Sequence, residues 1–337
     1  EFQSWRYSPK TGLYQRESSF LNIKSDFLEN TMLNKKILSV AVLACLTPLS
    51  SYATNGYSQH GFGTKSKGRA GAGAAIPLEG MSAGTNPALM VDVGDRMEIG
   101  IGLFSPKRAY TANDDGSPVG PPMGPPTIEP GRYESDKELF PVPHFAYNTK
   151  LSDNSSIGVA MAANGGMNTE YPKAVFAPFN NPMMGTEASS PTGMDFMQLL
   201  IGVPYAFKLN SDHAFGIMPF AAVQALKVYG LEPFKPFSEQ PDKVTNNGYS
   251  YSYGGGLRVG WFGKFGDRVG AGVSYQTKGW MSEFEDYAGL MAEQGDMDIP
   301  ATLIGGVSFK LNDRLTTVFD IQHIWYSDVS SIGNAHD

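Results

Sequence analysis

The sequence has few of the residues on which most binding and catalytic chemistry depends. Its 337 residues contain one cysteine, Cys45, which excludes an internal disulfide framework and a cysteine-based zinc site. The five histidines lie far apart and form no paired-ligand motif. The net charge of -7 argues against nucleic acid, which needs a basic surface. We therefore expect no metal, no cofactor and no nucleic-acid partner.

Catalytic motifs and long hydrophobic runs are missing as well. No G-x-S-x-G nucleophile motif occurs, and His144, which lies near the end of a strand-like segment, has no evident serine partner. We therefore expect no enzyme. A lipid-hydrolysis assay would detect the alternative, a lipase or protease. After Ala53 no run of about 18 apolar residues follows, so the sequence predicts no transmembrane helix.

Residues 32–53 are typical of an export signal. Lys35 and Lys36 form a basic start, residues 37–46 form an apolar run too short to span a bilayer, and small residues end the segment at Ala53. We interpret the segment as a secretory signal peptide.

Two alternatives remain for this segment, namely a buried core helix and a lipoprotein signal acylated at Cys45. Residues 1–31 precede a credible start at Met32 and show no pattern. We expect residues 1–31 to be a non-native or wrongly assigned extension that is not part of the fold.

The body of the chain alternates apolar and polar residues with period two, as β-strands do. The alternating segments are about 8–17 residues long, and a strand that crosses a bilayer at a tilt needs about 9–11 residues. The three clearest lie at 195–209, 249–262 and 268–282. Weaker ones lie at 97–104, 142–151, 155–171, 213–229, 299–311 and 314–326.

The connections alternate between long and short. Long connections at 105–140, 172–194, 230–248 and 284–298 take turns with tight ones such as 152–154 and 210–212. This is the pattern of extracellular loops and periplasmic turns, and a soluble β-sandwich has no reason for it. We predict an all-β protein, a transmembrane antiparallel β-barrel, because a sheet in lipid must close on itself to pair its backbone.

About nine strands are visible, whereas a bacterial barrel should have an even number. The sequence ends at residues 334–337 without an aromatic closing strand. We therefore expect the barrel, residues 93–337, to be incomplete at its C-terminus.

Residues 54–92 are rich in glycine and do not alternate. They contain a G-R-A-x-x-G stretch and an N-P-A motif, and this pattern resembles the N-terminal hatch of the FadL family of outer-membrane fatty-acid and aromatic-hydrocarbon transporters. Short matches continue from 103–106 to 326–329. A dinucleotide-binding glycine motif over 68–76 is the rival, but it needs a preceding strand and a following helix. The expected hatch residues are Gly68, Arg69, Gly73, Asn86, Pro87 and Ala88.

The resemblance implies a fourteen-stranded barrel with a plug, located in the Gram-negative outer membrane among its lipids and lipopolysaccharide. It implies uptake of hydrophobic small molecules, long-chain fatty acids or hydrocarbons, by a protein that we expect to be a monomer. A general diffusion porin or a structural barrel is the alternative, and single-channel conductance would separate them. Neither the residues nor the resemblance identifies the ligand.

The resemblance also implies where ligand binds and leaves. Capture would use two long loops, and their apolar side chains could equally pack the loops together. Asn164, Gly165 and Gly166 interrupt an alternating segment, as bulges do, and would form a lateral exit. The expected loop residues are Phe234, Phe237, Phe284, Tyr287, Leu290 and Met291. The expected contacts to a ligand head group or to the plug are Lys67, Arg69, Arg258 and Lys278, each of which could instead be structural.

Overall fold

The computed structural model describes residues 5–7, 14–16, 55–113 and 127–333. The chain divides into two units, residues 1–54 and 55–337. In the first, Trp5–Tyr7 (β1) pairs antiparallel with Tyr14–Arg16 (β2). The predicted signal peptide lies outside the described residues. Among those residues, no helix is long and apolar enough to cross a membrane.

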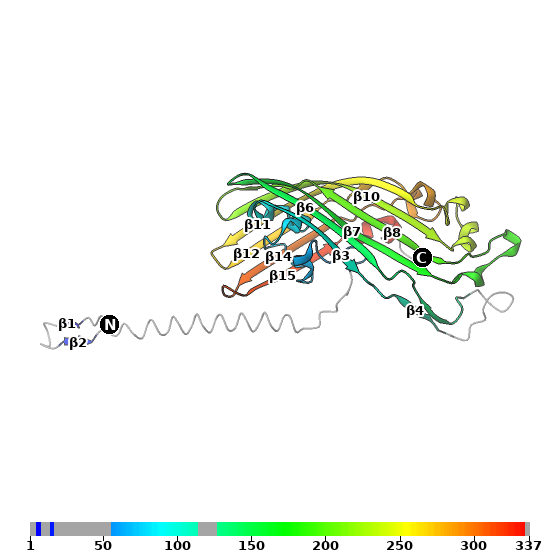
Figure 1. Ribbon diagram of the computed structural model, residues 1–337, viewed down its shortest axis with the longest axis horizontal. Helices are drawn as coiled ribbons and strands as arrows, with labels where there is room; N and C mark the ends of the chain where they lie inside the picture. The colour runs from blue at the N-terminus through cyan, green and yellow to red at the C-terminus, as the bar shows by residue number, and fades with distance from the viewer. Residues whose placement is uncertain (1–4, 8–13, 17–54, 114–126, 334–337) are drawn as a thin grey trace. The chain divides into compact units, whose positions relative to one another are not determined.

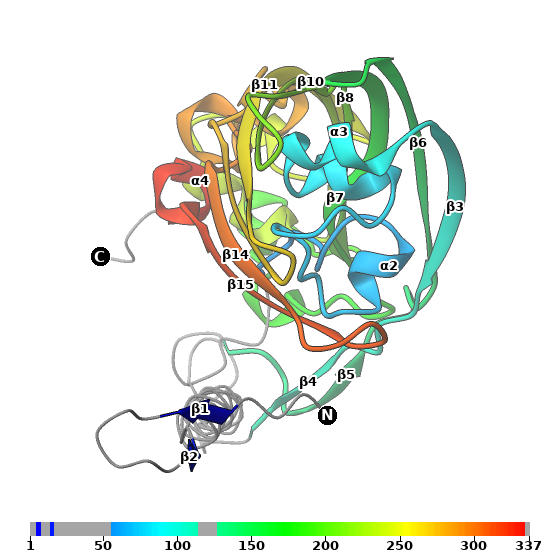
Figure 2. The same ribbon diagram turned by 90° about the vertical axis from the view of Figure 1, so that its left-hand side faces the viewer.

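The second unit is built on one curved antiparallel sheet of eleven strands (Figures 1 and 2). Strands β9 and β13 continue β8 and β12 after short breaks, so the sheet has nine wall segments in the order β15-β14-β12-β11-β10-β8-β7-β6-β3. The strands are β3 (Arg96–Phe104), β6 (Phe140–Ser152), β7 (Ser155–Tyr171), β8 (Thr192–Gly202), β9 (Tyr205–Lys208), β10 (His213–Tyr229), β11 (Ser250–Phe265), β12 (Val269–Gln276), β13 (Trp280–Met281), β14 (Thr302–Lys310) and β15 (Thr316–Ile324).

The alternation predicted from the sequence separates the two faces of this wall. Along β8, Met197 and Ile201 are exposed on the convex face, whereas Phe196 and Leu200 are buried on the concave face. An apolar convex face is typical of a barrel wall that faces hydrocarbon, and the concave face, which also carries large apolar side chains, encloses the interior. We call the space on the concave side the lumen.

Two predicted segments, 195–209 and 268–282, break once each. The first breaks at Pro204, which has no N–H to donate to its neighbour, but pairing resumes at once because the Pro204 carbonyl accepts from the Gly158 N–H at 2.9 Å. The second breaks at residues 277–279, where Gly279 instead pairs with Ile299. The wall keeps its register across the first break, whereas the pairing with β11 shifts by one residue across the second.

The hatch lies inside the curve of the wall (Figure 2). Its short helices are α2 (Thr64–Lys67), η1 (Gly80–Gly84), η2 (Pro87–Leu89) and α3 (Met90–Val93).

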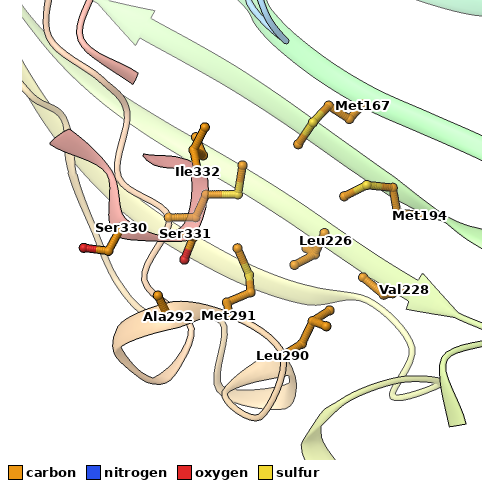
Figure 3. A pocket seen from close by; sticks show the side chains of 11 residues that line it. Met167, Met194, Leu226, Val228, Leu290, Met291, Ala292, Ser330, Ser331 and Ile332 are labelled. Carbon is orange, nitrogen blue, oxygen red and sulfur yellow. The ribbon is translucent and has the colours of Figure 1, made fainter. Parts of the chain in front are cut away.

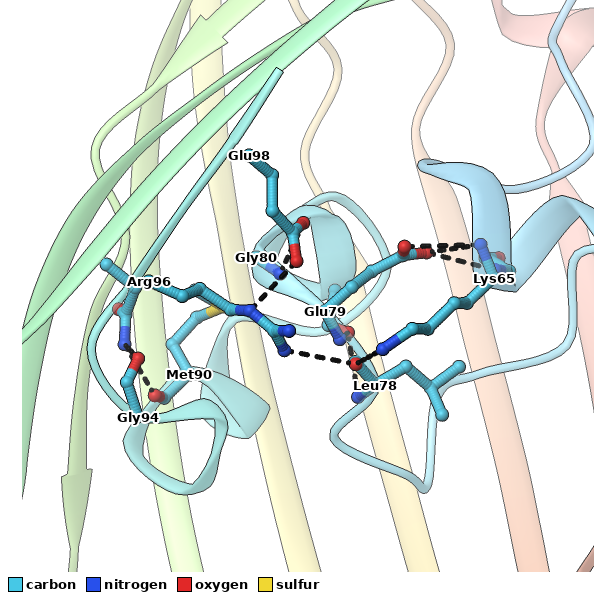
Figure 4. A network of polar contacts seen from close by, with 11 residues as sticks. Lys65, Leu78, Glu79, Gly80, Met90, Gly94, Arg96 and Glu98 are labelled. Atoms are coloured by element: carbon cyan, nitrogen blue, oxygen red, sulfur yellow. Dashed lines mark hydrogen bonds and ion pairs between the residues drawn. The ribbon is translucent and has the colours of Figure 1, made fainter. Parts of the chain in front are cut away.

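Polar contacts from the first wall strands position this hatch (Figure 4). Glu98 on β3 accepts from the Gly80 N–H at 2.8 Å and pairs with Arg96 at 2.9 Å. Glu79 accepts from the Lys65 N–H at 3.0 Å. Because hatch backbone groups bond to wall side chains, the hatch is docked on the wall rather than floating in the lumen.

The connections at the loop end carry the remaining elements. A hairpin that the sequence pattern did not reveal, β4 (Ala109–Ala112) with β5 (Gly131–Glu134), lies within the first long connection and is held by stacked Tyr110 and Tyr133 rings 4.9 Å apart. The others are η3 (Ala177–Phe179), η4 (Pro182–Met184), η5 (Glu232–Phe237), η6 (Pro241–Lys243), η7 (Glu285–Tyr287), η8 (Ala292–Gln294), η9 (Tyr326–Asp328) and α4 (Ser330–Gly333).

Candidate functional site

A cavity of about 440 Å³ lies between the wall and the loop 282–301 (Figure 3). Methionines from three elements dominate it, and their flexible, polarisable side chains suit loosely specified apolar ligands. The lining residues are Met167, Met194, Leu226, Val228, Leu290, Met291, Ala292, Met297, Ser330, Ser331 and Ile332.

A second cavity, of about 370 Å³, adjoins the first toward the loops. The two share Met194, Val228 and Leu290 in their linings. The second cavity adds aromatic rings, and its other lining residues are Tyr110, Ile128, Thr169, Tyr171, Val175, Phe176, Thr192, Gly193 and Leu231. The shared residues form a junction, so the two cavities lie in series.

Strand register explains why these side chains meet. Antiparallel partners point to the same face of a sheet, and β7, β8 and β10 are neighbours. Their lumen side chains therefore lie in rows across the three strands. From the loop end inward we name an upper row (Thr169, Met194, Val228), a middle row (Met167, Phe196, Leu226) and a lower row (Gly165, Gln198, Gln224).

The loop 282–301 is fixed over the upper row by one buried tyrosine. The Tyr287 hydroxyl accepts from the Val228 N–H at 2.9 Å and donates to the Gly248 carbonyl at 2.6 Å. Because Tyr287 is fully buried, these bonds have no competing water. They hold the loop, with Leu290 and Met291, against β10.

Tyr57 of the hatch forms an aromatic cluster with two residues outside it, beside the middle row. The Tyr57 ring meets Phe196 edge-on at 5.5 Å and Tyr326 at 5.3 Å. Leu226 and Met297, which line the first cavity, belong to the same buried cluster. The first cavity therefore adjoins the N-terminal segment of the hatch.

That segment, residues 55–59, is bonded to a β-bulge in β7. The β7–β8 register shifts by one residue between Ala163 and Gly165. The Gln59 N–H donates to the Asn164 carbonyl at 3.1 Å, and the Gly166 N–H donates to the Tyr57 carbonyl at 3.0 Å. A Cβ at Gly165 would lie 2.3 Å from the Tyr57 carbonyl oxygen, so this close approach requires glycine.

Further along, the hatch is clamped to the wall by an ionic contact. Asp92 on α3 pairs with Lys208 of β9 at 2.9 Å and with Lys264 of β11 at 2.7 Å. Burial alone would raise the pKa of Asp92, but hydrogen bonds and charge from the two ammonium groups outweigh it and lower the pKa. The clamp joins two wall segments through the hatch.

The pKa of Asp296, in the loop 282–301, is shifted in the opposite direction to that of Asp92. Burial raises the pKa of its carboxyl to about 6, the Asp298 carboxylate adds to the rise, and the Lys278 ammonium opposes it. Glu293 is the other charged group that raises it. The loop beside the first cavity thus contains a carboxyl that resists ionisation.

No protein-family model matches the sequence, and no curated protein matches it. Solved structures match its fold. The toluene transporter TodX of Pseudomonas putida is 17% identical, with a TM-score of 0.59 over 80% of this chain and 72% of its own. The toluene transporter TbuX of Ralstonia pickettii is 18% identical, with a TM-score of 0.55 over 80% and 73%. A FadL homologue of Pseudomonas aeruginosa is 17% identical, with a TM-score of 0.54 over 82% and 72%.

This chain has the FadL-type barrel fold. The predicted fold class, an antiparallel β wall around an N-terminal hatch, is confirmed. Within the described residues β3 and β15 are not paired with each other, so the wall is open between them. The fourteen strands and the incomplete C-terminus stay predictions.

The predicted capture residues of the FadL-type fold fall into two groups. Leu290 and Met291 line the cavities. Phe284 and Tyr287 are fully buried and pack within the loop and against β10 instead. In the other loop, Phe234 packs edge-on against Phe176 at 5.0 Å.

Phe237, on the same element η5, is 86% exposed. It is available to a ligand at the loop surface, but it does not line either cavity. A role for Phe237 in capture stays a prediction.

The four cations predicted to contact a ligand head group or the plug also fall into two groups. Lys278 pairs with the buried Asp298 at 2.6 Å. Arg258 is fully buried, bonds to Gln276 and lies over the Phe62 ring of the hatch at 5.4 Å. Both residues make contacts within the protein, and a role for either in holding a ligand head group stays a prediction.

Lys67 and Arg69 are exposed on the hatch. Neither forms an ion pair with a residue in the part of the chain that the structure describes. Neither lines a cavity, so a role in holding a head group stays a prediction for both.

The predicted hatch motif residues mostly make specific contacts. Asn86 donates to the Ala74 and Trp261 carbonyls, each at 2.9 Å. Gly73 donates its N–H to Asp320 of β15 at 2.8 Å. Gly68 caps α2 and is exposed.

Pro87 and Ala88 pack against β10. A Cβ at Gly216 would lie 2.3 Å from the Ala88 nitrogen, so the hatch backbone touches the wall directly. The N-P-A motif is therefore a docking element of the hatch.

Several residues at the site were not identified from the sequence. Met194 and Leu226 belong to alternating strands, and only the three-strand register shows that they share a cavity. Tyr57 and Tyr326 meet across 269 residues of chain, as their ring contact shows. No sequence signal marks that pairing, although an aromatic residue at the hatch start is a weak hint.

Proposed function

We propose that this chain takes up hydrophobic small molecules across a Gram-negative outer membrane. The observation that carries the proposal is the series of two apolar cavities that ends at a hatch segment bonded into a wall bulge. The likeness to toluene transporters supports the same class of function. Fatty acids and hydrocarbons both fit an apolar lining of this kind.

In this proposal, ligand enters the second cavity between the loops and passes the junction of Met194, Val228 and Leu290. It then occupies the first cavity, beside Tyr57. The hatch segment 55–59 leaves the bulge of β7, and ligand exits sideways through Asn164, Gly165 and Gly166. Direct release into the lipid phase suits an apolar solute because it never has to be dissolved in water.

The junction gives a direct test. Met194→Trp places a larger side chain between the cavities, and we expect uptake of toluene or of a long-chain fatty acid to fall at least tenfold. Met197→Trp is the matched control, because it lies on the same strand but on the convex face, 47% exposed. Uptake would be measured in cells without other hydrophobic-compound channels, at equal amounts of folded protein. Unchanged uptake by the Met194 variant would contradict the proposed path.

A general diffusion porin is less well supported, because the hatch occupies the lumen and is bonded to the wall on several strands. Ion conductance through the unaltered protein would favour that alternative.

A further inference from the structure

The two cavities differ in the kind of side chain that forms their walls. Four methionines line the first cavity, and no aromatic ring of the described residues does so. The second cavity is lined by three aromatic rings, those of Tyr110, Tyr171 and Phe176. A methionine side chain adapts to what it contacts, whereas an aromatic side chain is large and rigid. The second cavity, where ligand enters in the proposed path, is therefore the less adaptable of the two.

Tyr110 is the ring of this cavity that comes from the hairpin and not from the wall. Its ring stacks on Tyr133 of β5 at 4.9 Å, with 6° between the ring planes, and meets Tyr171 of β7 edge-on at 5.2 Å. Burial raises the pKa of Tyr110 to about 12, and the neighbouring Tyr133 and Tyr171 add to the rise. Tyr133 is itself buried, and its hydroxyl donates to the Glu129 carbonyl at 2.8 Å. Tyr110 is thus held from behind by a ring that is fixed in turn.

The hairpin that carries Tyr110 is fastened to β7 at Glu170. The Glu170 carbonyl accepts from the Asp136 N–H at 2.8 Å, and the Glu170 N–H donates to the Ser135 hydroxyl at 3.0 Å. The Glu170 carboxylate pairs with Lys137 at 3.5 Å. Because backbone and side chain both take part, the hairpin cannot leave β7 without breaking all three contacts. The position of Tyr110 over the cavity is therefore fixed as well.

Phe176, a second ring of this cavity, is held in a similar way. It packs edge-on against Phe234 at 5.0 Å and against Phe179 at 6.0 Å. Neither of these two partners lines the cavity. Rings with partners behind them cannot turn aside to make room for a ligand.

We infer that Tyr110 determines ligand shape, so that the second cavity admits flat or unbranched apolar molecules and excludes bulky, cage-shaped ones. To admit a cage, the Tyr110 ring has to leave both Tyr133 and Tyr171. Each aromatic contact contributes roughly two- to tenfold in an equilibrium constant, so a bulky ligand is disfavoured by roughly five- to a hundredfold. The methionines of the first cavity set no such limit. The inference rests on the proposed function, because it assigns a substrate class to the same path.

The test compares naphthalene, which is flat, with adamantane, a cage with the same number of carbon atoms. Uptake of each by the unaltered full chain is measured by gas chromatography of cell extracts, in cells without other hydrophobic-compound channels. The values are corrected for uptake by cells without the protein. We expect the unaltered protein to take up naphthalene at least fivefold faster than adamantane.

A gain of uptake then assigns the limit to Tyr110. Tyr110→Ala should raise adamantane uptake at least fivefold and change naphthalene uptake less than twofold. Misfolding would lower both values and a leaky barrel would raise both, so neither reproduces this result. Two matched controls should keep the original ratio: Tyr251→Ala removes a ring that is 54% exposed on the convex face, and Met291→Ala enlarges the first cavity only.

Three results would overturn the role of Tyr110 and leave the proposed function standing. They are equal uptake of both hydrocarbons by the unaltered protein, no gain of adamantane uptake in Tyr110→Ala, and an equal gain in Met291→Ala. Uptake of neither hydrocarbon would also overturn the inference, and a lack of toluene and fatty-acid uptake besides would overturn the proposed function with it.

Discussion

The hydroxyl of Tyr326 holds the hatch segment on the bulge of β7, and Tyr326→Phe isolates its contribution. The hydroxyl donates to the Asn55 carbonyl, accepts from the Ser58 N–H at 3.3 Å and contacts the Ser58 hydroxyl at 2.9 Å. Phenylalanine removes these contacts but keeps the ring that packs on Tyr57 at 5.3 Å. The substitution therefore weakens docking without emptying the aromatic cluster.

The magnitude follows from the bonds that are lost. A neutral hydrogen bond contributes about 0.5–1.5 kcal/mol net. The 3.3 Å contact is long, so we count two effective bonds and expect docking to weaken by about 1–3 kcal/mol. Each 1.4 kcal/mol is tenfold in an equilibrium constant, so the undocked fraction should rise by roughly five- to a hundredfold.

Hydrogen exchange measures this fraction directly. The amides of Gln59 and Gly166 bond across the contact between hatch and bulge, so both should exchange faster in the variant by the same factor. Tyr133→Phe is the control, because the Tyr133 hydroxyl donates to the Glu129 carbonyl at 2.8 Å, away from the hatch segment, and its removal should leave both amides unchanged. If both amides exchanged at the original rate in Tyr326→Phe, the docking argument would be refuted. Faster exchange without any change in uptake would count against the lateral exit.

Two carboxyl groups give further predictions. Asp92→Asn breaks the clamp to Lys208 and Lys264 and should cost about 2 kcal/mol of stability, measured as the unfolding temperature in detergent. Because the pKa of Asp92 is lowered, its contribution is present above pH 3.8 and is lost as pH falls through the folded-state pKa, so the gap between the two proteins should close in acid. For Asp296, the pKa raised to about 6 means that stability is lost as pH rises from about 4 toward 6. Asp296→Asn should remove that loss and make the loop 282–301 more resistant to proteolysis at pH 7. Equal resistance of the two proteins would contradict the argument that burial and the nearby Asp298 carboxylate disfavour the ionised form of Asp296.

The wall could be predicted from the sequence because the alternation of residues within each strand shows, without knowledge of its partners, that one face of the strand lies in an apolar medium. A strand with one face in an apolar medium must alternate, so 195–209 and 249–262 were recognisable without knowledge of their partners. The break at Pro204 was not predicted, because the apolar alternation of 195–209 continues through it although proline has no N–H to donate. The hairpin β4–β5 was missed because four-residue strands are too short for alternation to stand out.

The site could be predicted only in part, because it depends on contacts between distant segments. The glycines at 165–166 indicated a bulge, but nothing in the sequence identified residues 55–59 as the segment bonded to it. Apolar loop residues look alike in sequence whether they line a cavity or pack against each other. Leu290 does the first and Phe284 does the second, and the difference arises from the register of the wall beneath them.

The bulge itself determines what the first cavity is made of. Before it, even-numbered residues of β7 such as Ala162 face the lumen, and after it odd-numbered residues such as Met167 do, because one extra residue reverses the alternation. If β7 kept all its residues but paired without the bulge, Met167 would point to the convex face and the polar Asn168 would take its place in the middle row. The bulge on which the hatch segment docks thus also keeps Met167, rather than Asn168, on the lumen face of this sequence. Deletion of Asn164 removes the extra residue and restores regular pairing with Met167 still facing the lumen. It should therefore abolish the bond from the Gln59 N–H to the bulge, seen as faster hydrogen exchange of that amide, while the cavity lining stays apolar.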